Sequence, residues 1–309
     1  MPTCRLSREG PRYPWGRGRM PPMKIANLFQ TGSPAISFEF FPPKTDKGFQ
    51  SLYRTIGELQ SINPGFVSVT MGAGGSTRSK TVDLVIEIEK NLGLTAMTHL
   101  PCVGFTRDEV AHILDSLTGA GLENVLALRG DPPKDVPDFV APEGGFEHAA
   151  EIVEFIREGW DLCIGAAAFP ETHPDAKDPE TDLRHLHQKV QLGTDFLVTQ
   201  FFFDNAAYFD FVKRARAIGI TVPIVPGIMP ITSTANVKRM PSFGGGAFPS
   251  ELRSQLDACE GDDEKTLELG VRWATLQCRE LIDSGAPGIH FYTLNRSSAT
   301  RRIHAELFA

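Results

Sequence analysis

Residues 163 to 202, CIGAAAFPETHPDAKDPETDLRHLHQKVQLGTDFLVTQFF, hold two short apolar runs with one helical pattern between them. CIGAAAF (163–169) and DFLVTQFF (195–202) are continuous apolar runs, which are typical of parallel strands buried on both faces. DLRHLHQKVQLG (182–193) places its apolar residues three and four positions apart, the spacing of an amphipathic helix. The stretch therefore predicts a strand, a crossover helix and a second, parallel strand.

Six further apolar runs of this kind lie on either side of the stretch. Most consecutive runs are about thirty residues apart, enough for a strand, a helix and two loops. The last interval is about twice as long and holds STANVKRM, SELRSQLDACEG and KTLELGVRWATLQCRELIDSG, so we expect extra helices there. The six runs are AISFEF (35–40), FVSVTM (66–71), LTAMTH (94–99), NVLALR (124–129), VPIVPGI (222–228) and GIHFYTL (288–294).

Helical patterns also occupy three earlier gaps: GFQSLYRTIGELQSI (48–62), SKTVDLVIEIEKNLG (79–93) and TRDEVAHILDSLTGAG (106–121). Eight strands alternating with helices favour a closed (β/α)8 TIM barrel of the α/β class over an open doubly wound sheet. The GxGxxG fingerprint of dinucleotide-binding sheets does not follow the first run. We therefore expect a single (β/α)8 domain over 24–309, with extra helices between the seventh and eighth strands.

Composition and charge narrow the class of protein. The 309 residues carry a net charge of -7, which disfavours a nucleic-acid partner because such binders gather lysine and arginine. The five cysteines lack CxxC spacing and the histidines lack ligand spacing, so we expect a cytoplasmic protein without disulfides or a metal site. No apolar run reaches the roughly 18 residues of a membrane span. Residues 1–23 are rich in Arg, Pro and Gly and predict a disordered or mis-started extension, a basic arm or transit peptide being the alternative.

Polar side chains recur where the expected strands end. Active sites of (β/α)8 barrels are built at the carboxyl ends of the strands, so these side chains favour a ligand pocket over a purely structural barrel. The positions are Glu39, Thr70, His99, Arg129, Asp131, His173, Gln200, Asn295 and Arg296.

Glu39 lies between two phenylalanines in SFEFFPP, at the end of the first expected strand. Burial against aromatic surface raises the pKa of a carboxyl group, and a raised pKa suits a general acid that works near neutral pH. An internal ion pair with an arginine or lysine is the alternative. The segment therefore makes Glu39 the first candidate for a proton donor.

Three later segments carry further candidate ligand contacts. The helix after the fifth strand places Asp182, His185, Gln188 and Lys189 on one face, which would line an extended ligand or face solvent. In TQFFFDNAAYF, Gln200 precedes three phenylalanines, of which at least one is positioned to stack on a planar ring while the others pack in the core. Arg296 follows the eighth strand and would clamp a carboxylate or pair internally.

Taken together, these segments resemble the bacterial methylenetetrahydrofolate reductases, a family of FAD-containing (β/α)8 barrels. The resemblance covers about residues 30 to 305. Eight segments follow the family's order at matching intervals, which is far more specific than any one of them alone. They are SFEFFPP, VTMGAGGSTR, THLPCVG, LALRGDPPK, AAAFPETHP, TQFFFDNAAYF, PIVPGIMPI and HFYTLNRSS.

The resemblance implies roles for individual residues. Glu39 would be the catalytic acid, Asp131 would contact the pterin beside the flavin, and further folate contacts would come from Gln200, Asn236 and Arg296. Met71 and Phe169 stand where tyrosine is familiar in the family, and His185, Gln188 and Asn236 replace Asn, Arg and Gln. Non-covalently held FAD would contact Thr70, Met71, Ala73, His99, Arg129, Gly130, Asp131, His148, Ala149, Phe169, His173, Ala176, Asp182, His185, Gln188 and Lys189.

The resemblance also implies a reaction, the reduction of 5,10-methylenetetrahydrofolate to 5-methyltetrahydrofolate in one-carbon metabolism and methionine biosynthesis. NADH or NADPH would pass hydride to FAD and leave, and the reduced flavin would then pass hydride to the folate. Glu39 would protonate the folate so that its five-membered ring opens to an iminium. A homo-oligomer is implied as well. The alternatives are a folate- or flavin-binding barrel without turnover and a metal- or lysine-dependent lyase, for which the sequence offers no ligand cluster or strand-end lysine.

Overall fold

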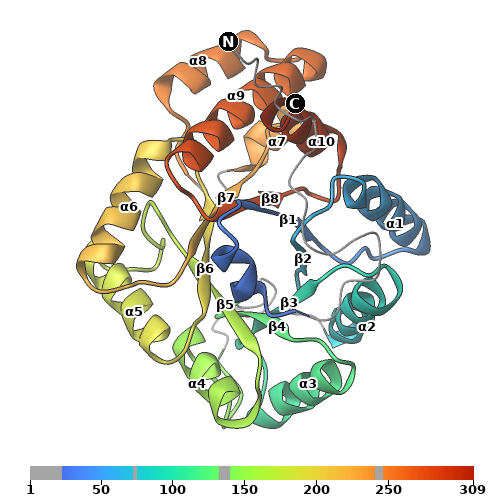
Figure 1. The fold of residues 1–309 in the computed structure, drawn as a ribbon, viewed down its shortest axis with the longest axis vertical. Helices are drawn as coiled ribbons and strands as arrows, with labels where there is room; N and C mark the ends of the chain where they lie inside the picture. Colours follow the sequence, from blue (N-terminus) through green and yellow to red (C-terminus); the bar gives the residue numbers. More distant parts are fainter. Residues whose placement is uncertain (1–22, 72–74, 132–139, 241–245) are drawn as a thin grey trace, which may run out of the picture.

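A computed structural model of the chain describes residues 23–71, 75–131, 140–240 and 246–309 (Figure 1). Eight parallel strands pair in chain order, and the last strand pairs with the first to close the barrel. The expected TIM barrel and all eight expected strands are thereby confirmed. Of the expected N-terminal extension, residues 1–22 lie outside the described part of the chain. The strands are β1 (Ala35–Phe40), β2 (Phe66–Val69), β3 (Ala96–Pro101), β4 (Asn124–Leu128), β5 (Cys163–Ala168), β6 (Phe196–Phe201), β7 (Ile224–Ile228) and β8 (Gly288–Tyr292).

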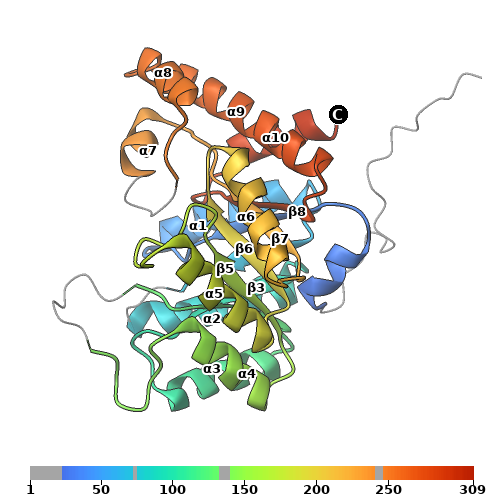
Figure 2. The same ribbon diagram turned by 90° about the vertical axis from the view of Figure 1, so that its left-hand side faces the viewer.

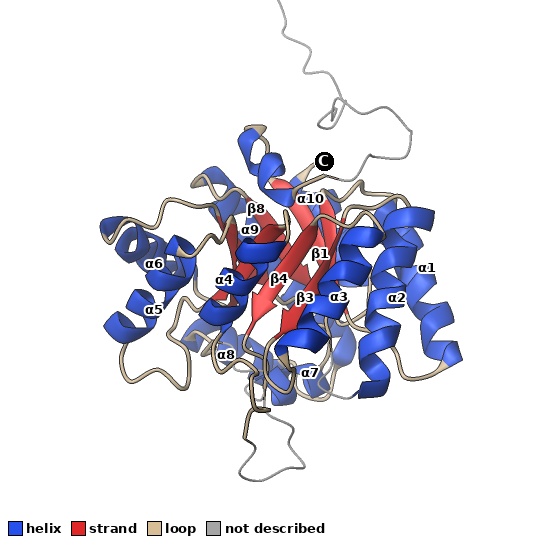
Figure 3. Ribbon diagram, turned by 90° about the horizontal axis from the view of Figure 1, so that it is seen from below, coloured by secondary structure: helices blue, strands red, loops and turns tan. Residues whose placement is uncertain are grey.

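Helices surround the barrel, as Figure 3 shows with strands in red and helices in blue. All the helices expected from sequence patterns are present, including the extra ones between β7 and β8. The patterns had not singled out α4, α6 and α10. The helices are α1 (Asp46–Gln60), α2 (Gly75–Asn91), α3 (Arg107–Gly119), α4 (Ala149–Gly159), α5 (Pro179–Gln191), α6 (Asn205–Ala217), α7 (Thr234–Arg239), α8 (Ser250–Ala258), α9 (Asp263–Asp283) and α10 (Ser298–Leu307). None of the described helices is both long and apolar enough to cross a lipid bilayer.

Local capping explains where several of these helices begin. Helix α3 starts with a capping box, in which Thr106 accepts from the backbone of Glu109 and the Glu109 carboxylate accepts from the backbone of Thr106. Helix α5 follows Asp178, whose carboxylate accepts from the backbone of Thr181, and has proline at its first position. These start signals fix where the loops after β3 and β5 end.

Alternation along β1 separates the barrel interior from the layer beneath the helices. Phe38 and Phe40 belong to the large core between the strands and the surrounding helices. Ala35 belongs to a second core inside the barrel, so Glu39, four positions further on, faces the same interior. The two phenylalanines beside Glu39 therefore point away from its carboxyl group. The expectation that they bury it is wrong, because a strand sends neighbouring side chains to opposite faces.

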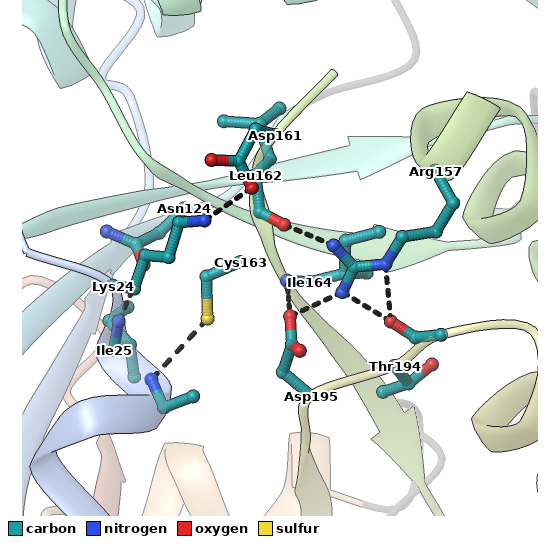
Figure 4. Close-up of polar contacts among 12 residues, drawn as sticks. Lys24, Ile25, Asn124, Arg157, Asp161, Leu162, Cys163, Ile164, Thr194 and Asp195 are labelled. Atoms are coloured by element: carbon teal, nitrogen blue, oxygen red, sulfur yellow. Dashed lines mark hydrogen bonds and ion pairs between the residues drawn. The ribbon is translucent and has the colours of Figure 1, made fainter. Parts of the chain in front are cut away.

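A short 3-10 helix, η1 (Ile25–Gln30), closes the N-terminal end of the barrel. It lies at the end opposite α7 (Figure 2, blue turn). Ile25 and Leu28 pack into the interior core. Figure 4 shows the side-chain amide of Asn124 beside this segment, where it accepts from the backbone of Ile25 at 2.8 Å and donates to the carbonyl of Met23 at 2.9 Å.

The same end of the barrel is tied to α4 through Arg157 (Figure 4). Its guanidinium donates to the backbone carbonyls of Leu162 and Gly193, at 2.6 and 2.8 Å, and pairs with the carboxylate of Asp195 at 2.5 Å. Asp195 also accepts from the backbone of Ile164 at 2.7 Å. The contacts hold the N-terminal ends of β5 and β6 in place, at the end of the barrel opposite the carboxyl ends of the strands.

Candidate active site

The carboxyl group of Glu39 lies beside His99 near the carboxyl end of β1. Oε2 of Glu39 is 3.4 Å from Nε2 of His99, and the two side chains are 17% and 9% exposed. Burial raises the pKa of Glu39 from 4.5 to about 8 and lowers that of His99 from 6.5 to about 3. Between these two pKa values both groups are neutral, so their contact is a hydrogen bond rather than an ion pair.

Buried hydrogen bonds continue from His99 into the barrel. Oγ of Ser68 lies 3.3 Å from Nε2 of His99 and 3.3 Å from Nε2 of His290. Nδ1 of His290 is 2.8 Å from Oγ of Ser37, which donates to the carbonyl of Ile289 at 3.2 Å. Burial, with a smaller effect from His99, lowers the pKa of His290 to about 3, so this ring is neutral as well. Sequence reasoning missed Ser37, Ser68 and His290, although alternation outward from Glu39 would have placed Ser37 on its face.

Tyr292 lies on another side of Glu39. The β1–β8 register pairs the two residues directly. The phenol donates to the carbonyl of Thr199 at 2.7 Å, and its ring occupies the space over Gly227. Burial, reinforced by the nearby Glu39, raises the pKa of Tyr292 well above its ordinary value, so the phenol remains a donor. Sequence reasoning missed Tyr292 too, because the motif drew attention to the loop beyond it.

A second group of expected site residues gathers in the loops after β4 and β5. Arg129 pairs with the carboxylate of Asp175 at 2.6 Å. The backbone of Asp175 donates to Nδ1 of His173 at 3.0 Å, and the backbone of His173 donates to Asp182 at 2.9 Å. The ring of His173 packs edge-on against Phe169, with centroids 4.5 Å apart. Asp175 thus joins Arg129 to His173, and His173 in turn contacts Phe169 and Asp182. Four residues expected at the flavin site are thereby brought together.

The expected ligand face of α5 divides into two parts. Lys189 is directed inward, and its ammonium donates to the carbonyl of Ala167 at 2.7 Å. Burial lowers the pKa of Lys189 to about 8, against the opposing effect of Asp182. His185 and Gln188 are exposed. Lys189 and Asp182 therefore lie towards the loop cluster, whereas the other two residues match the solvent-facing alternative.

The turn after β4 depends on a glycine. Gly130 has a φ of +79°, and a β-carbon there would lie 2.7 Å from Cβ of Pro101. Only glycine adopts this conformation without strain and also fits the space. The turn carries the half-buried Arg129 on one side and the exposed Asp131 on the other.

The other expected contacts are distributed around the barrel. Asn236 lies in α7 and donates to Oγ1 of Thr232 at 3.0 Å, and Arg296 is exposed in the loop after β8. Among the described residues, no contact joins Asn236 or Arg296 to Glu39 or His99. Ala73 lies outside the described residues. The remaining positions are Thr70 and the buried Met71 after β2, the exposed His148 before α4, Ala149 at its start, Ala176 in the loop before α5, and the partly buried Gln200 in β6.

Comparisons with known proteins identify relatives of the whole barrel. A family model described as methylenetetrahydrofolate reductase matches residues 24–307. The chain is 37% identical to the 5,10-methylenetetrahydrofolate reductase of Salmonella typhimurium, over 87% of this chain and 88% of the relative. It is 36% identical to the enzyme of that name from Escherichia coli, with the same coverage. It is also 38% identical to methylenetetrahydrofolate reductase (NADH) 1 of Arabidopsis thaliana, over 88% of this chain and 48% of the relative. The chain therefore spans about half the length of that relative.

A solved structure shares the fold. It is an uncharacterized protein from Clostridium thermocellum that binds two copies of 5-methyl-5,6,7,8-tetrahydrofolic acid. The TM-score is 0.65 over 92% of this chain and 98% of that chain, at 18% sequence identity. At this identity the likeness concerns the fold alone.

Proposed function

Because the chain belongs to the methylenetetrahydrofolate reductase family, we propose that it reduces 5,10-methylenetetrahydrofolate to 5-methyltetrahydrofolate. The observation that carries the proposal is the neutral carboxyl of Glu39 at the barrel mouth. With a pKa of about 8, this group holds its proton at neutral pH and loses it readily to a base that it contacts. A general acid needs both properties.

Glu39 supplies the proton that the substrate needs before it can be reduced. Protonation of the folate nitrogen breaks the carbon–nitrogen bond that closes the five-membered ring, leaving an iminium carbon that accepts hydride. The proton from Glu39 and the hydride together convert the methylene group to methyl. The neutral His99, 3.4 Å from Glu39, places no positive charge beside the acid that would lower its pKa.

FAD is the cofactor that we propose for this site, and the chemistry of the loop residues fits it. Arg129 and Lys189 bring two cations to the loops after β4 and β5, where they would hold a diphosphate, and Gly130 allows close approach of the backbone. When bound, FAD supplies the hydride-transfer chemistry between NADH or NADPH and the folate. The remaining FAD contacts inferred from the resemblance stay predictions.

The folate contacts form a separate part of the proposal. The exposed Asp131 would orient the pterin, and Gln200 and Asn236 would hydrogen-bond the substrate. Arg296 would pair with a folate carboxylate, since its guanidinium lies exposed just past β8. On the family resemblance, we also propose that the protein works in the cytoplasm as a homo-oligomer.

The test separates the two half-reactions of anaerobic protein with bound FAD. Glu39→Gln should keep reduction of the flavin by NADH within about twofold of wild type, and should slow oxidation by methylenetetrahydrofolate by roughly 10²–10⁴-fold, the contribution of a general acid. Glu251→Gln, on the exposed surface of α8, serves as the matched control and should change neither rate.

Two results would overturn the proposal. Wild-type protein that retains FAD but never passes hydride to the folate would instead indicate a binding barrel without turnover. Equal loss of both half-reactions in Glu39→Gln would remove Glu39 from the acid role.

A further inference from the structure

The buried hydrogen bonds below Glu39 have only one arrangement of hydrogens that satisfies every contact, and Ser37 sets its direction. Oγ of Ser37 lies within hydrogen-bond distance of both Nδ1 of His290 and the carbonyl of Ile289. The carbonyl can only accept, so the Ser37 hydroxyl donates to it. Ser37 must then accept from His290, which carries its hydrogen on Nδ1. The reverse orientation would leave two acceptors facing each other at the Ile289 carbonyl.

Ser68 carries this direction to the next ring. His290 is neutral and protonated on Nδ1, so its Nε2 has a lone pair and must accept. The donor is the hydroxyl of Ser68, at 3.3 Å. Since that hydroxyl has one hydrogen, its oxygen accepts on the other side, from Nε2 of His99 at 3.3 Å. His99 therefore carries its hydrogen on Nε2.

We propose that Ser37, His290 and Ser68 are positioning residues that hold His99 in the Nε2–H form and so direct the acidic proton of Glu39 to Oε1. The Nε2–H of His99 points between Ser68 and Oε2 of Glu39, at 3.3 and 3.4 Å. Oε2 accepts from it, which leaves the acidic hydrogen to the other oxygen. The inference rests on the proposed function, because it concerns how Glu39 presents its proton to the folate.

The Ser37 end of this hydrogen-bonded chain is closed to solvent, so water cannot reach it there and reverse the direction of the hydrogen bonds. Ser37, Ser68 and His290 are at most 1% exposed. The ring of His290 stacks on Phe66, which packs against Phe196, and Phe196 in turn contacts Phe29 of η1. The η1 segment lies at the closed end of the barrel (Figure 2). Proton exchange with Glu39 therefore takes place at the barrel mouth.

Nitrogen-15 NMR of the histidine rings tests this inference without folate. Protein with bound FAD is labelled with [15N]histidine, and the signals of His99 and His290 are assigned by their loss in His99→Gln and His290→Gln. Near neutral pH we expect the hydrogen on Nε2 in His99 and on Nδ1 in His290. Hydrogen on Nδ1 of His99 would overturn the proposal, even if the folate reaction occurs as proposed.

Substitution of Ser68 tests whether the chain controls His99. Ser68→Ala removes the hydroxyl that links the two rings by hydrogen bonds, so His99 should show a mixture of both tautomers, and Ser68→Thr should restore the single form. The folate half-reaction should fall by about tenfold in Ser68→Ala, while flavin reduction by NADH is unchanged, since only part of the general-acid contribution is lost. Ser61→Ala, on the surface, is the matched control.

The outcomes separate positioning from a merely structural role. An unchanged His99 tautomer in Ser68→Ala would overturn the proposal, as would equal losses in both half-reactions. If Ser68→Ala does not fold, the tautomers of the wild-type rings decide the question. Correct tautomers in a protein that does not reduce the folate would refute the proposed function instead.

Discussion

The ring of Tyr292 lies over Gly227, where a β-carbon would come within 2.5 Å of the ring. This space lets the phenol cross β7 and reach the carbonyl of Thr199 on β6. The β6–β7 ladder shifts register at the same place, and the backbone of Gly227 donates to Oγ1 of Thr199 at 2.9 Å. Gly227 does not have a positive φ. Glycine is required there because the ring of Tyr292, beside Glu39, occupies the space of a side chain.

Gly227→Ala should destabilise the fold and displace Tyr292. The added methyl group would meet the Thr199 carbonyl at 2.2 Å as well as the ring, and overpacking of this kind costs about 1–3 kcal/mol. Urea unfolding gives the change in free energy. Gly57→Ala in α1 is the control, since nothing lies within 4 Å of its β-carbon and it should stabilise the helix by up to about 1 kcal/mol. Equal stability of Gly227→Ala and wild type would contradict the geometry.

The folate half-reaction should slow at alkaline pH. The acid must be protonated to act, and the pKa of Glu39 is about 8, so the rate should be constant below that value and fall tenfold per pH unit above it. Flavin reduction by NADH in the same protein is the internal control and should not follow this curve. A folate half-reaction that accelerates between pH 8 and 10 would show that the ionised form of Glu39 is the active one.

The same pKa makes stability depend on pH. Below 4.5 Glu39 is protonated in both the folded and unfolded chain. From 4.5 to about 8 only the unfolded chain ionises, so wild type should lose up to about 1.4 kcal/mol per pH unit relative to Glu39→Gln. Above about 8 the difference should level off. Urea unfolding of both proteins at several pH values measures it, and parallel curves would mean that Glu39 is not buried as described.

The buried histidines should act in the opposite direction. The pKa of His99 and of His290 falls from 6.5 to about 3 on folding, so each contributes stability that is present above 6.5 and lost as the pH falls towards 3. The slope of unfolding free energy against pH should therefore decrease in His290→Gln between these values. Gln191→Ala is the control. Gln191 is exposed on α5, so this substitution should leave the slope unchanged.

The strands could be predicted from sequence because both of their faces are buried. Continuous apolar runs bounded by polar or turn residues indicate where such strands begin and end. The run AISFEF (35–40), for example, predicts the full length of β1. Helix α6 was harder to find, because only Asp204 and Asn205 separate the phenylalanine run at the end of β6 from the apolar residues of the helix. Strong runs therefore predict elements better than the boundaries between them.

The candidate site was predicted only in part, because several of its residues lie far apart in the sequence. Glu39 and His99 were both chosen from strand ends, and the structure brings them to 3.4 Å. Ser68 and His290 are ordinary strand residues in the sequence, separated by 222 positions, and only closure of the barrel makes them neighbours. Side-chain direction on α5 was also undetermined, because periodicity does not say which part of a helical face packs inward.

Asn124→Ala should loosen η1 and destabilise the barrel. The buried amide of Asn124 satisfies the backbone of Ile25 and the carbonyl of Met23, and loss of a buried hydrogen-bond partner costs about 1–3 kcal/mol. Urea unfolding gives the loss, and hydrogen exchange should accelerate at Ile25 more than in the barrel strands. Asn91→Ala is the control, because its exposed amide donates to the side chain of its helix neighbour Glu87 and its removal should change stability by less than about 0.5 kcal/mol. Similar losses in both variants would show that η1 is held by the packing of Ile25 and not by the amide.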